Sequence, residues 1–211
     1  MSKIKNIIFA ILVSFCYTST SQIIAITETG DKVILYNDGS WIYDVSNHVI
    51  NSEIKTNNKL FKKDKKSTFL VKSKVFNIGV YLNPQDWSFE KDYNDPTAEY
   101  IFNYKNGDLY AMMITEEMEI PLEVLKGIAL ENGRSAAPDI HIAKEEYRTV
   151  NGHKLLMLQL NGTIEGIKFS YYGYYFSNEN GTVQLITYTS QSLFNKYKEA
   201  AEKLLNGFVE L

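Results

Sequence analysis

The chain has 211 residues, of which 45% are hydrophobic, and a formal net charge of −3. This apolar content excludes a wholly disordered chain, and the length predicts one or two domains with a buried core. The acidic balance argues against general nucleic-acid binding, which needs a basic surface to neutralise phosphates.

Residues 1–21 have the pattern of a secretory signal peptide. Two early lysines precede a short apolar run, and small polar residues close the segment. The run is shorter than the about 20 residues that a membrane-spanning helix needs, and no later segment resembles a transmembrane span. Ser19 and Ser21 fit the small positions that a signal peptidase reads. We therefore expect cleavage before Gln22 and a periplasmic or secreted mature protein.

Cys16 is the single cysteine, and it lies inside the predicted leader. Its removal leaves no thiol, which excludes disulfides, cysteine nucleophiles and thiolate metal ligands from the mature chain. The alternative is a lipoprotein anchored through Cys16, but Phe15 stands where lipoprotein processing requires a small residue. The sequence thus predicts an exported fold that is held together by packing alone.

Residues 22–45 predict a small three-stranded β-meander. Apolar, β-branched runs alternate here with turn signals, in the order 23–27, Thr29-Gly30-Asp31, 33–36, Asn37-Asp38-Gly39-Ser40 and 41–43. Glycine tolerates the positive φ of tight turns, so both breaks favour antiparallel hairpins. A unit of this size is only marginally stable alone.

Residues 46–67 predict a polar, basic linker. The segment is rich in Asn, Ser and Lys, with five lysines from Lys59 to Lys66. A solvated tether is the simplest interpretation of this composition. The alternative is a basic arm in peripheral contact with anionic lipid or glycan, although screening over a Debye length of about 8 Å leaves such contact weak.

Residues 68–211 predict an α+β domain. One helical period begins at Pro121 and ends near Asn132-Gly133, and a second covers residues 192–205. Two glycosylation-like triplets, Asn161-Gly162-Thr163 and Asn180-Gly181-Thr182, are interpreted as turns. Strand signals occur at 69–73, 75–82, 98–104, 109–115, 140–150, 155–160, 167–176 and 183–189. The pattern predicts an antiparallel sheet of about six or seven strands covered by two helices.

Four pieces of this domain occur in a recognisable order. They are Asn83-Pro84-Gln85-Asp86-Trp87, the hairpin Val150-Asn151-Gly152, the strand at 183–189, and the helix end Leu204-Leu205-Asn206-Gly207-Phe208. Their order over about residues 69–211 resembles the PsbP-like superfamily, which includes the extrinsic P-protein of photosystem II, DcrB and Mog-type relatives. The resemblance implies an α/β/α sandwich and, since members are mostly binding or assembly factors, a non-catalytic role.

No constellation of residues predicts a specific reaction. His48, His141 and His153 lack the spacing of a zinc site, and His141 and His153 should lie at opposite ends of one hairpin. Glu116 and Glu119 are the best candidates for an acid–base pair, but acidic groups before a helix also interact favourably with its dipole. We therefore predict no catalytic residue, no metal ligand and no cofactor.

Aromatic residues concentrate at 169–176, in a chain with 15 tyrosines. Because side chains alternate along a strand, both faces of this segment should be aromatic, with Gly173 leaving a gap for a neighbouring ring or a ligand. Filling a two-sided sheet is the simplest interpretation. The alternative is a surface for a glycan or protein partner at Trp87, Tyr172 and Tyr174.

Together, the leader, the missing catalytic constellation and the resemblance predict an exported, non-catalytic binding or assembly module of a bacterial cell envelope. Its partner would be an unknown envelope protein or a glycan. The alternatives are a small secreted hydrolase that uses Glu116 and Glu119, and a carrier that holds an apolar ligand between sheet and helix.

Export yields the first testable prediction. Protein recovered from its own host should begin at Gln22, because the leader is removed during secretion. N-terminal sequencing or intact mass measurement checks this start. A soluble cytoplasmic chain that retains Met1 would contradict export.

Overall fold

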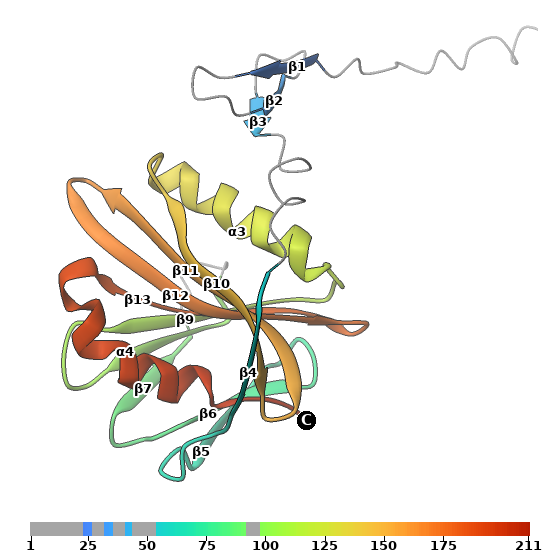
Figure 1. Cartoon of the computed structure of the whole chain (residues 1–211). Coiled ribbons are helices and arrows are strands. Elements are labelled where there is room, and N and C mark those ends of the chain that lie inside the picture. Colours follow the sequence, from blue (N-terminus) through green and yellow to red (C-terminus); the bar gives the residue numbers. More distant parts are fainter. Residues whose placement is uncertain (1–22, 27–31, 36–40, 44–53, 92–97) are drawn as a thin grey trace, which may run out of the picture. The chain divides into compact units, whose positions relative to one another are not determined.

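The computed structural model describes residues 23–26, 32–35, 41–43, 54–91 and 98–211 (Figure 1). The predicted signal peptide at 1–21 and the part of the predicted linker at 46–53 lie outside these residues. The chain divides into two compact units, Met1–His48 and Val49–Leu211.

The first unit contains the small sheet that its turn signals predict. Strands β1 (Ile23–Ile26), β2 (Lys32–Leu35) and β3 (Trp41–Tyr43) pair antiparallel in the order β1-β2-β3. In the register, Leu35 lies opposite Ile23 on one side and Trp41 on the other. Val33 on the central strand is buried.

An eight-stranded mixed sheet forms the centre of the second unit. Its order is β4-β10-β11-β12-β13-β9-β8-β7, and all neighbours are antiparallel except β4 and β10. The strands are β4 (Thr56–Phe61), β7 (Trp87–Glu90), β8 (Tyr100–Tyr104), β9 (Tyr110–Glu116), β10 (His141–Val150), β11 (His153–Ile164), β12 (Ile167–Asn178) and β13 (Gly181–Ser190).

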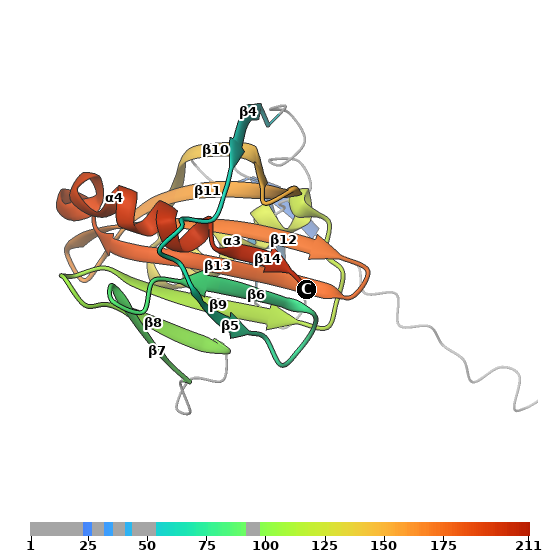
Figure 2. The ribbon, with the colours of Figure 1, turned by 90° about the horizontal axis from the view of Figure 1, so that it is seen from below.

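The two faces of this sheet are covered differently (Figures 1 and 2). Helix α3 (Leu122–Ala136) packs on β11 and β12 on one face. On the other face lie helix α4 (Gln191–Leu205) and a three-stranded sheet in the order β14-β6-β5. That sheet consists of β5 (Phe69–Lys72), β6 (Ile78–Leu82) and β14 (Phe208–Glu210).

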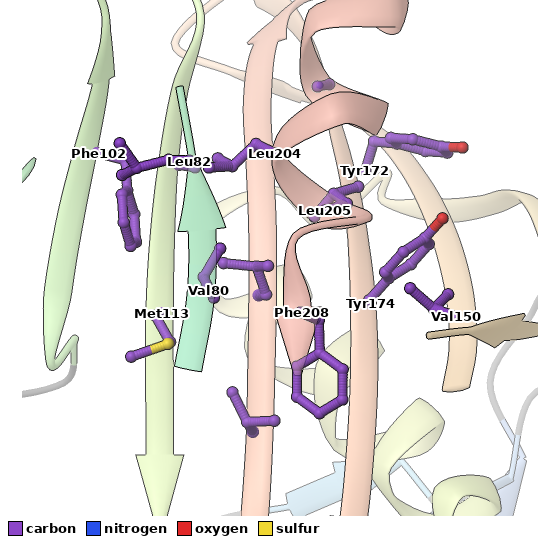
Figure 3. Close-up of a cluster of buried hydrophobic side chains, with 14 of the residues drawn as sticks. Val80, Leu82, Phe102, Met113, Val150, Tyr172, Tyr174, Leu204, Leu205 and Phe208 are labelled. Carbon is purple, nitrogen blue, oxygen red and sulfur yellow. The ribbon is translucent and has the colours of Figure 1, made fainter. Parts of the chain in front are cut away.

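Strand β12 contributes aromatic rings to both cores. Tyr172 and Tyr174 belong to the core under α4, which Figure 3 shows together with Leu205 and Phe208. Tyr175, on the opposite face, belongs to the core under α3. The alternation predicted for this strand is therefore confirmed, and both of its faces are packed.

The structure corrects the prediction of one antiparallel sheet. Strands β5, β6 and β14 form a separate sheet, and β4 joins the large sheet in parallel. Strands β4, β7 and β14 were not predicted, because β4 and β7 expose most of their side chains and β14 has only three residues. Backbone pairing with a neighbouring strand stabilises such segments, and a single-sequence pattern does not reveal it.

The predicted linker at 46–67 also needs correction. Its second half is the edge strand β4, whose carbonyl at Phe61 accepts a hydrogen bond from the Asn151 amide at 3.0 Å. Phe61 is buried, and the Arg148 guanidinium lies 4.4 Å from its ring centroid. The lysines from Lys59 to Lys66 thus belong to the folded domain. The segment looked like a tether because an edge strand keeps most of its side chains in water.

Of the two triplets interpreted as turns, Asn161-Gly162-Thr163 instead lies inside β11. The turn that follows is Glu165-Gly166, with φ of 49° and 81°. A Cβ on Gly162 would come within 3.2 Å of the Ala137 Cβ and 3.3 Å of the Ile140 Cα. The glycine therefore allows β11 to pack closely against the segment after α3.

The anchoring of β4 yields a stability prediction. Phe61→Ala should lower the free energy of unfolding by about 3 kcal/mol, because it removes a buried ring and its contact with Arg148. The neighbouring Leu60 is 65% exposed, so Leu60→Ala should change stability by less than about 0.5 kcal/mol. Urea unfolding of both variants checks this. Equal effects would mean that β4 is not anchored through Phe61.

Candidate functional site

The three aromatic residues predicted at a partner surface are buried. Trp87, Tyr172 and Tyr174 are 4%, 1% and 1% exposed. They are also not adjacent, because β13, β9 and β8 separate β12 from β7 in the sheet. The prediction that these rings form an exposed recognition surface is therefore wrong, because α4 and the small sheet cover this face of the large sheet.

Tyr172 and Tyr174 take part in a buried polar network around Arg148. The guanidinium donates to Glu146 Oε1 at 2.6 Å and to the Tyr174 hydroxyl at 2.9 Å. It also forms an ion pair with Glu202, whose carboxylate accepts from the Tyr172 hydroxyl at 2.7 Å. Burial raises the pKa of Tyr174 to about 12, so this hydroxyl stays protonated. The network joins β10, β12 and α4 and has the character of a structural anchor.

Trp87 lines a polar cleft of about 230 Å³ between α4 and the segments around β7. Several charged groups of this cleft already have partners in its own walls. Glu199 pairs with Lys203 at 2.7 Å, and Asp86 accepts from the Asn83 amide at 2.6 Å. Because these side chains already bind one another, few of them are free to bind a ligand, and we do not assign a binding site to this cleft.

The titratable residues considered in the sequence are not gathered into one site. His141 lies opposite Asn161 and His153 opposite Val150, so the two histidines are at opposite ends of the β10–β11 hairpin, as predicted. Glu116 and Glu119 are both exposed and line neither the cleft nor the groove described below. Within the described residues, no three His, Cys, Asp or Glu side chains lie where they could share a metal ion.

The described part of the chain also contains no helix with the length and apolarity that a membrane span requires.

The sheet face beside α3 carries three tyrosines in one row. Tyr171 of β12 lies opposite Tyr188 of β13, which lies opposite Tyr110 of β9. Helix α3 packs mainly on β11 and β12, so it leaves the adjoining part of β13 and β9 without a helix. The uncovered surface is apolar: in the next row, Ile186 lies opposite Met112.

This uncovered surface is hollowed into two lobes, which we call the apolar groove. The first lobe, of about 450 Å³, lies between α3 and the sheet. The second lobe, of about 460 Å³, lies beyond the tyrosine row, and Tyr171 lines both. The first lobe includes Ala129, Gly133 and Ala136 of α3 with Ile114, Gln184 and Ile186 of the sheet. The second includes Tyr110, Tyr188, Ile164, Ile167, Phe169 and Leu193.

Gly133 and Gly173 allow close packing beside the first lobe. On α3, a Cβ at Gly133 would lie 2.4 Å from Ile140 Cδ1, so the glycine favours the close approach of that side chain. On the floor, Gly173 of β12 places no side chain between Tyr171 and Tyr175. Ile186 takes part of this space, since its Cγ1 would lie 3.2 Å from a Cβ at Gly173. The gap predicted at Gly173 is thus on the groove side of the sheet.

The tyrosine row forms a wall. The rings of Tyr110 and Tyr188 are stacked, with centroids 5.6 Å apart and planes 26° apart. Side chains stand roughly perpendicular to a sheet, so stacked rings on neighbouring strands face each other and present their edges outward. Burial raises the pKa of Tyr171 and of Tyr188, so both hydroxyls remain uncharged.

The sequence did not identify this groove. Tyr110 and Tyr188 lie at the ends of strands that were predicted, but nothing local indicates that these strands are neighbours. Small residues at 129, 133 and 136 on one side of the first helix were the available signal. Such spacing is common in closely packed helices, so it does not by itself indicate a site.

Comparison with solved structures shows that the second unit has a PsbP-like fold. Cyanobacterial PsbP (CyanoP) from Synechocystis sp. PCC 6803 is 12% identical, with a TM-score of 0.51 over 70% of this chain and 95% of that one. LpqN of Mycobacterium tuberculosis, described as involved in cell envelope biogenesis, is 13% identical, with a TM-score of 0.46 over 80% and 97%. PA94 of Pseudomonas aeruginosa, a putative regulator, is 13% identical, with a TM-score of 0.43 over 68% and 96%.

No protein-family model matches the chain, and no curated protein matches its sequence. At such low identity, the structural likeness establishes the fold and leaves the activity open.

The buried network yields a prediction on acid stability. Burial of Glu146 opposes ionisation, but hydrogen bonds from Arg148 and Asn57 outweigh it and hold the pKa below the ordinary value of 4.5. A lowered pKa stabilises the fold above the unfolded value, and this contribution disappears as the pH falls through the folded value. Glu146→Gln should therefore cost about 2 kcal/mol at pH 7 and flatten the loss of stability below about pH 4.5.

Chemical denaturation of wild type and Glu146→Gln between pH 7 and pH 3 measures this difference. Glu179→Gln is the control, because Glu179 is exposed in the turn between β12 and β13. Parallel pH profiles for wild type and Glu146→Gln would contradict the assignment.

Proposed function

We propose that the protein is an exported, non-catalytic binding module of the bacterial cell envelope and that the apolar groove is its binding surface. The observation that carries the proposal is the sheet face that α3 leaves uncovered over β13 and β9. Export is supported by the leader pattern at residues 1–21.

The dimensions and chemistry of the groove suit binding. Each lobe lies in the range of about 300 to 1,000 Å³ that is usual for ligand sites, and such sites are mostly apolar with a few polar groups. A contiguous apolar hollow on a protein surface commonly marks an interaction site. A partner that covers this surface gains about 25 cal/mol for each Å² of apolar area removed from water.

The lining of the groove supports binding over catalysis. Acid–base and nucleophilic mechanisms need a titratable or activated group directed at the substrate. The first lobe is lined by apolar and uncharged polar side chains. Asp108 and Glu165 line the second lobe, and both are exposed. Glu116 and Glu119, on which the hydrolase alternative depends, lie outside both lobes.

A carrier of an apolar ligand is the second candidate function. It is favoured by the position of the first lobe, which has α3 on one side and the sheet on the other. A ligand in this lobe would be held between Ala136 of the helix and Ile186 of the floor. Binding a small ligand and binding an envelope partner use the same surface, so one groove variant tests both.

Ile186→Glu is the test variant, because it places a carboxylate on the half-buried floor of the first lobe. Capture of a partner from envelope extract, or retention of a co-purified ligand in native mass spectrometry, should fall by at least about tenfold, since a charge in an apolar contact is unfavourable.

Val124→Glu is the matched control. Val124 is 51% exposed on α3 and lines neither lobe, so this variant should bind like wild type. Circular dichroism confirms that both variants fold. If Ile186→Glu retains the full set of partners and ligands, the groove is not the binding surface.

A further inference from the structure

We infer that the apolar groove takes an uncharged, elongated ligand, with a hydrogen-bonding end at Gln184 and an apolar body that passes Tyr171 into the second lobe. This inference rests on the proposed function and specifies the ligand of the same surface. Three observations support it. The side-chain amide of Gln184 faces the first lobe, the described lining residues of both lobes include no cation, and the paired residues of β12, β13 and β9 follow one another along the strands in a fixed order.

Gln184 supplies a polar group without a partner. The residue is 6% exposed and lines the first lobe. Among the described residues, no hydrogen bond to its side-chain amide is present, although the neighbouring buried polar residues Thr182 and Thr187 both have partners. Its polar atoms are not sealed off, so they remain accessible from the lobe. A ligand that covers this amide removes its water, so a ligand hydroxyl or carbonyl that restores the hydrogen bond is favoured over an apolar end.

The charges of the groove exclude an anionic ligand end. The described residues that line the two lobes include no lysine, arginine or histidine. Among these described lining residues, the charged side chains are the exposed Asp108 and Glu165 of the second lobe. A carboxylate or phosphate in the first lobe would lose its hydration without gaining a cation. An uncharged polar end matches the amide of Gln184.

The order of the paired residues along β12, β13 and β9 determines the direction in which the ligand lies. Gln184 lies between Tyr175 and Ile114 at one end of the groove. The next row holds Ile186, and the row after it holds Tyr171 and Tyr188. A chain that begins at Gln184 therefore crosses the apolar floor before it reaches the second lobe.

The arrangement of the tyrosines disfavours a glycan as the occupant. Sugar rings stack on exposed aromatic faces, whereas Tyr110 and Tyr188 cover one face of each other and Tyr171 packs against Tyr188 edge to face. A row of rings packed in this way suits an aliphatic chain that lies along it.

The experiment is displacement of an uncharged fluorescent dye, N-phenyl-1-naphthylamine, from the purified mature protein. The competitors are 1-hexanol, 1-octanol, 1-decanol, 1-chlorodecane and, at pH 8, decanoate. Alcohol affinity should rise by about twofold to fourfold for each CH₂. Decanoate should bind at least about tenfold more weakly than 1-decanol, because its charge finds no partner.

Gln184→Leu tests the polar end. It should weaken 1-decanol by about threefold to tenfold and leave 1-chlorodecane unchanged, because only the alcohol loses a hydrogen bond. A uniform effect on both competitors would overturn the role of Gln184.

Ala136→Trp tests the path of the ligand. Ala136 is exposed at the end of α3 and lines the first lobe, so the indole fills that lobe without a buried clash. The variant should weaken 1-decanol by more than about tenfold, since the chain of this alcohol runs through the first lobe. Val124→Trp is the control and should behave like wild type. Equal effects of the two tryptophan variants would overturn the location.

Failure of the inference can be told apart from failure of the proposed function. If the dye does not bind, or if decanoate competes as well as 1-decanol, the ligand class is overturned. If Ile186→Glu still abolishes partner capture in that case, the groove remains a binding surface and its occupant is a protein. If the dye experiments succeed and Ile186→Glu weakens 1-decanol but still captures every envelope partner, the inferred site stands and the proposed role in the envelope falls.

Discussion

Strand β12 is aromatic on both faces, and this constraint organises the second unit. Each face must be removed from water, so the strand lies inside the sheet with helices on both sides. On one face, α4 and the small sheet β14-β6-β5 supply the cover. On the other face, α3 is the one helix among the described residues, and it packs mainly on β11 and β12.

The two faces of the large sheet differ in how completely they are covered, and we assign a structural role to one and binding to the other. Under α4, the hydroxyls of Tyr172 and Tyr174 are satisfied by Arg148, by Glu202 of α4 and by Asn206 at its end, so these rings form part of a closed core. Under α3, the cover stops before β13 and β9, and the groove remains. This incomplete cover leaves the tyrosine row and the side-chain amide of Gln184 open to solvent or to a ligand.

Local patterns predicted much of the fold, and their failures have physical reasons. Both described helices and the Asn151-Gly152 turn were predicted because their signals lie within a few residues of one another. Strand β4 was missed, since an edge strand needs only one buried side chain, Phe61, and looks polar otherwise. Gly162 was assigned to a turn because the reason for a glycine at this position cannot be seen locally. That reason is the close approach of Ala137 and Ile140, which are far away in the chain.

The sequence by itself determined the leader pattern, the place of the single cysteine within it, and the alternation that makes β12 two-sided, because each depends only on residue type and near neighbours. Tertiary structure alone decided that β13 pairs with β9. That pairing brings Tyr110, Tyr171 and Tyr188 into one row, and Trp87 is buried elsewhere. Strand order follows from long-range pairing and helix cover, which are set by the packing of the whole domain and leave no periodic signal in a single strand.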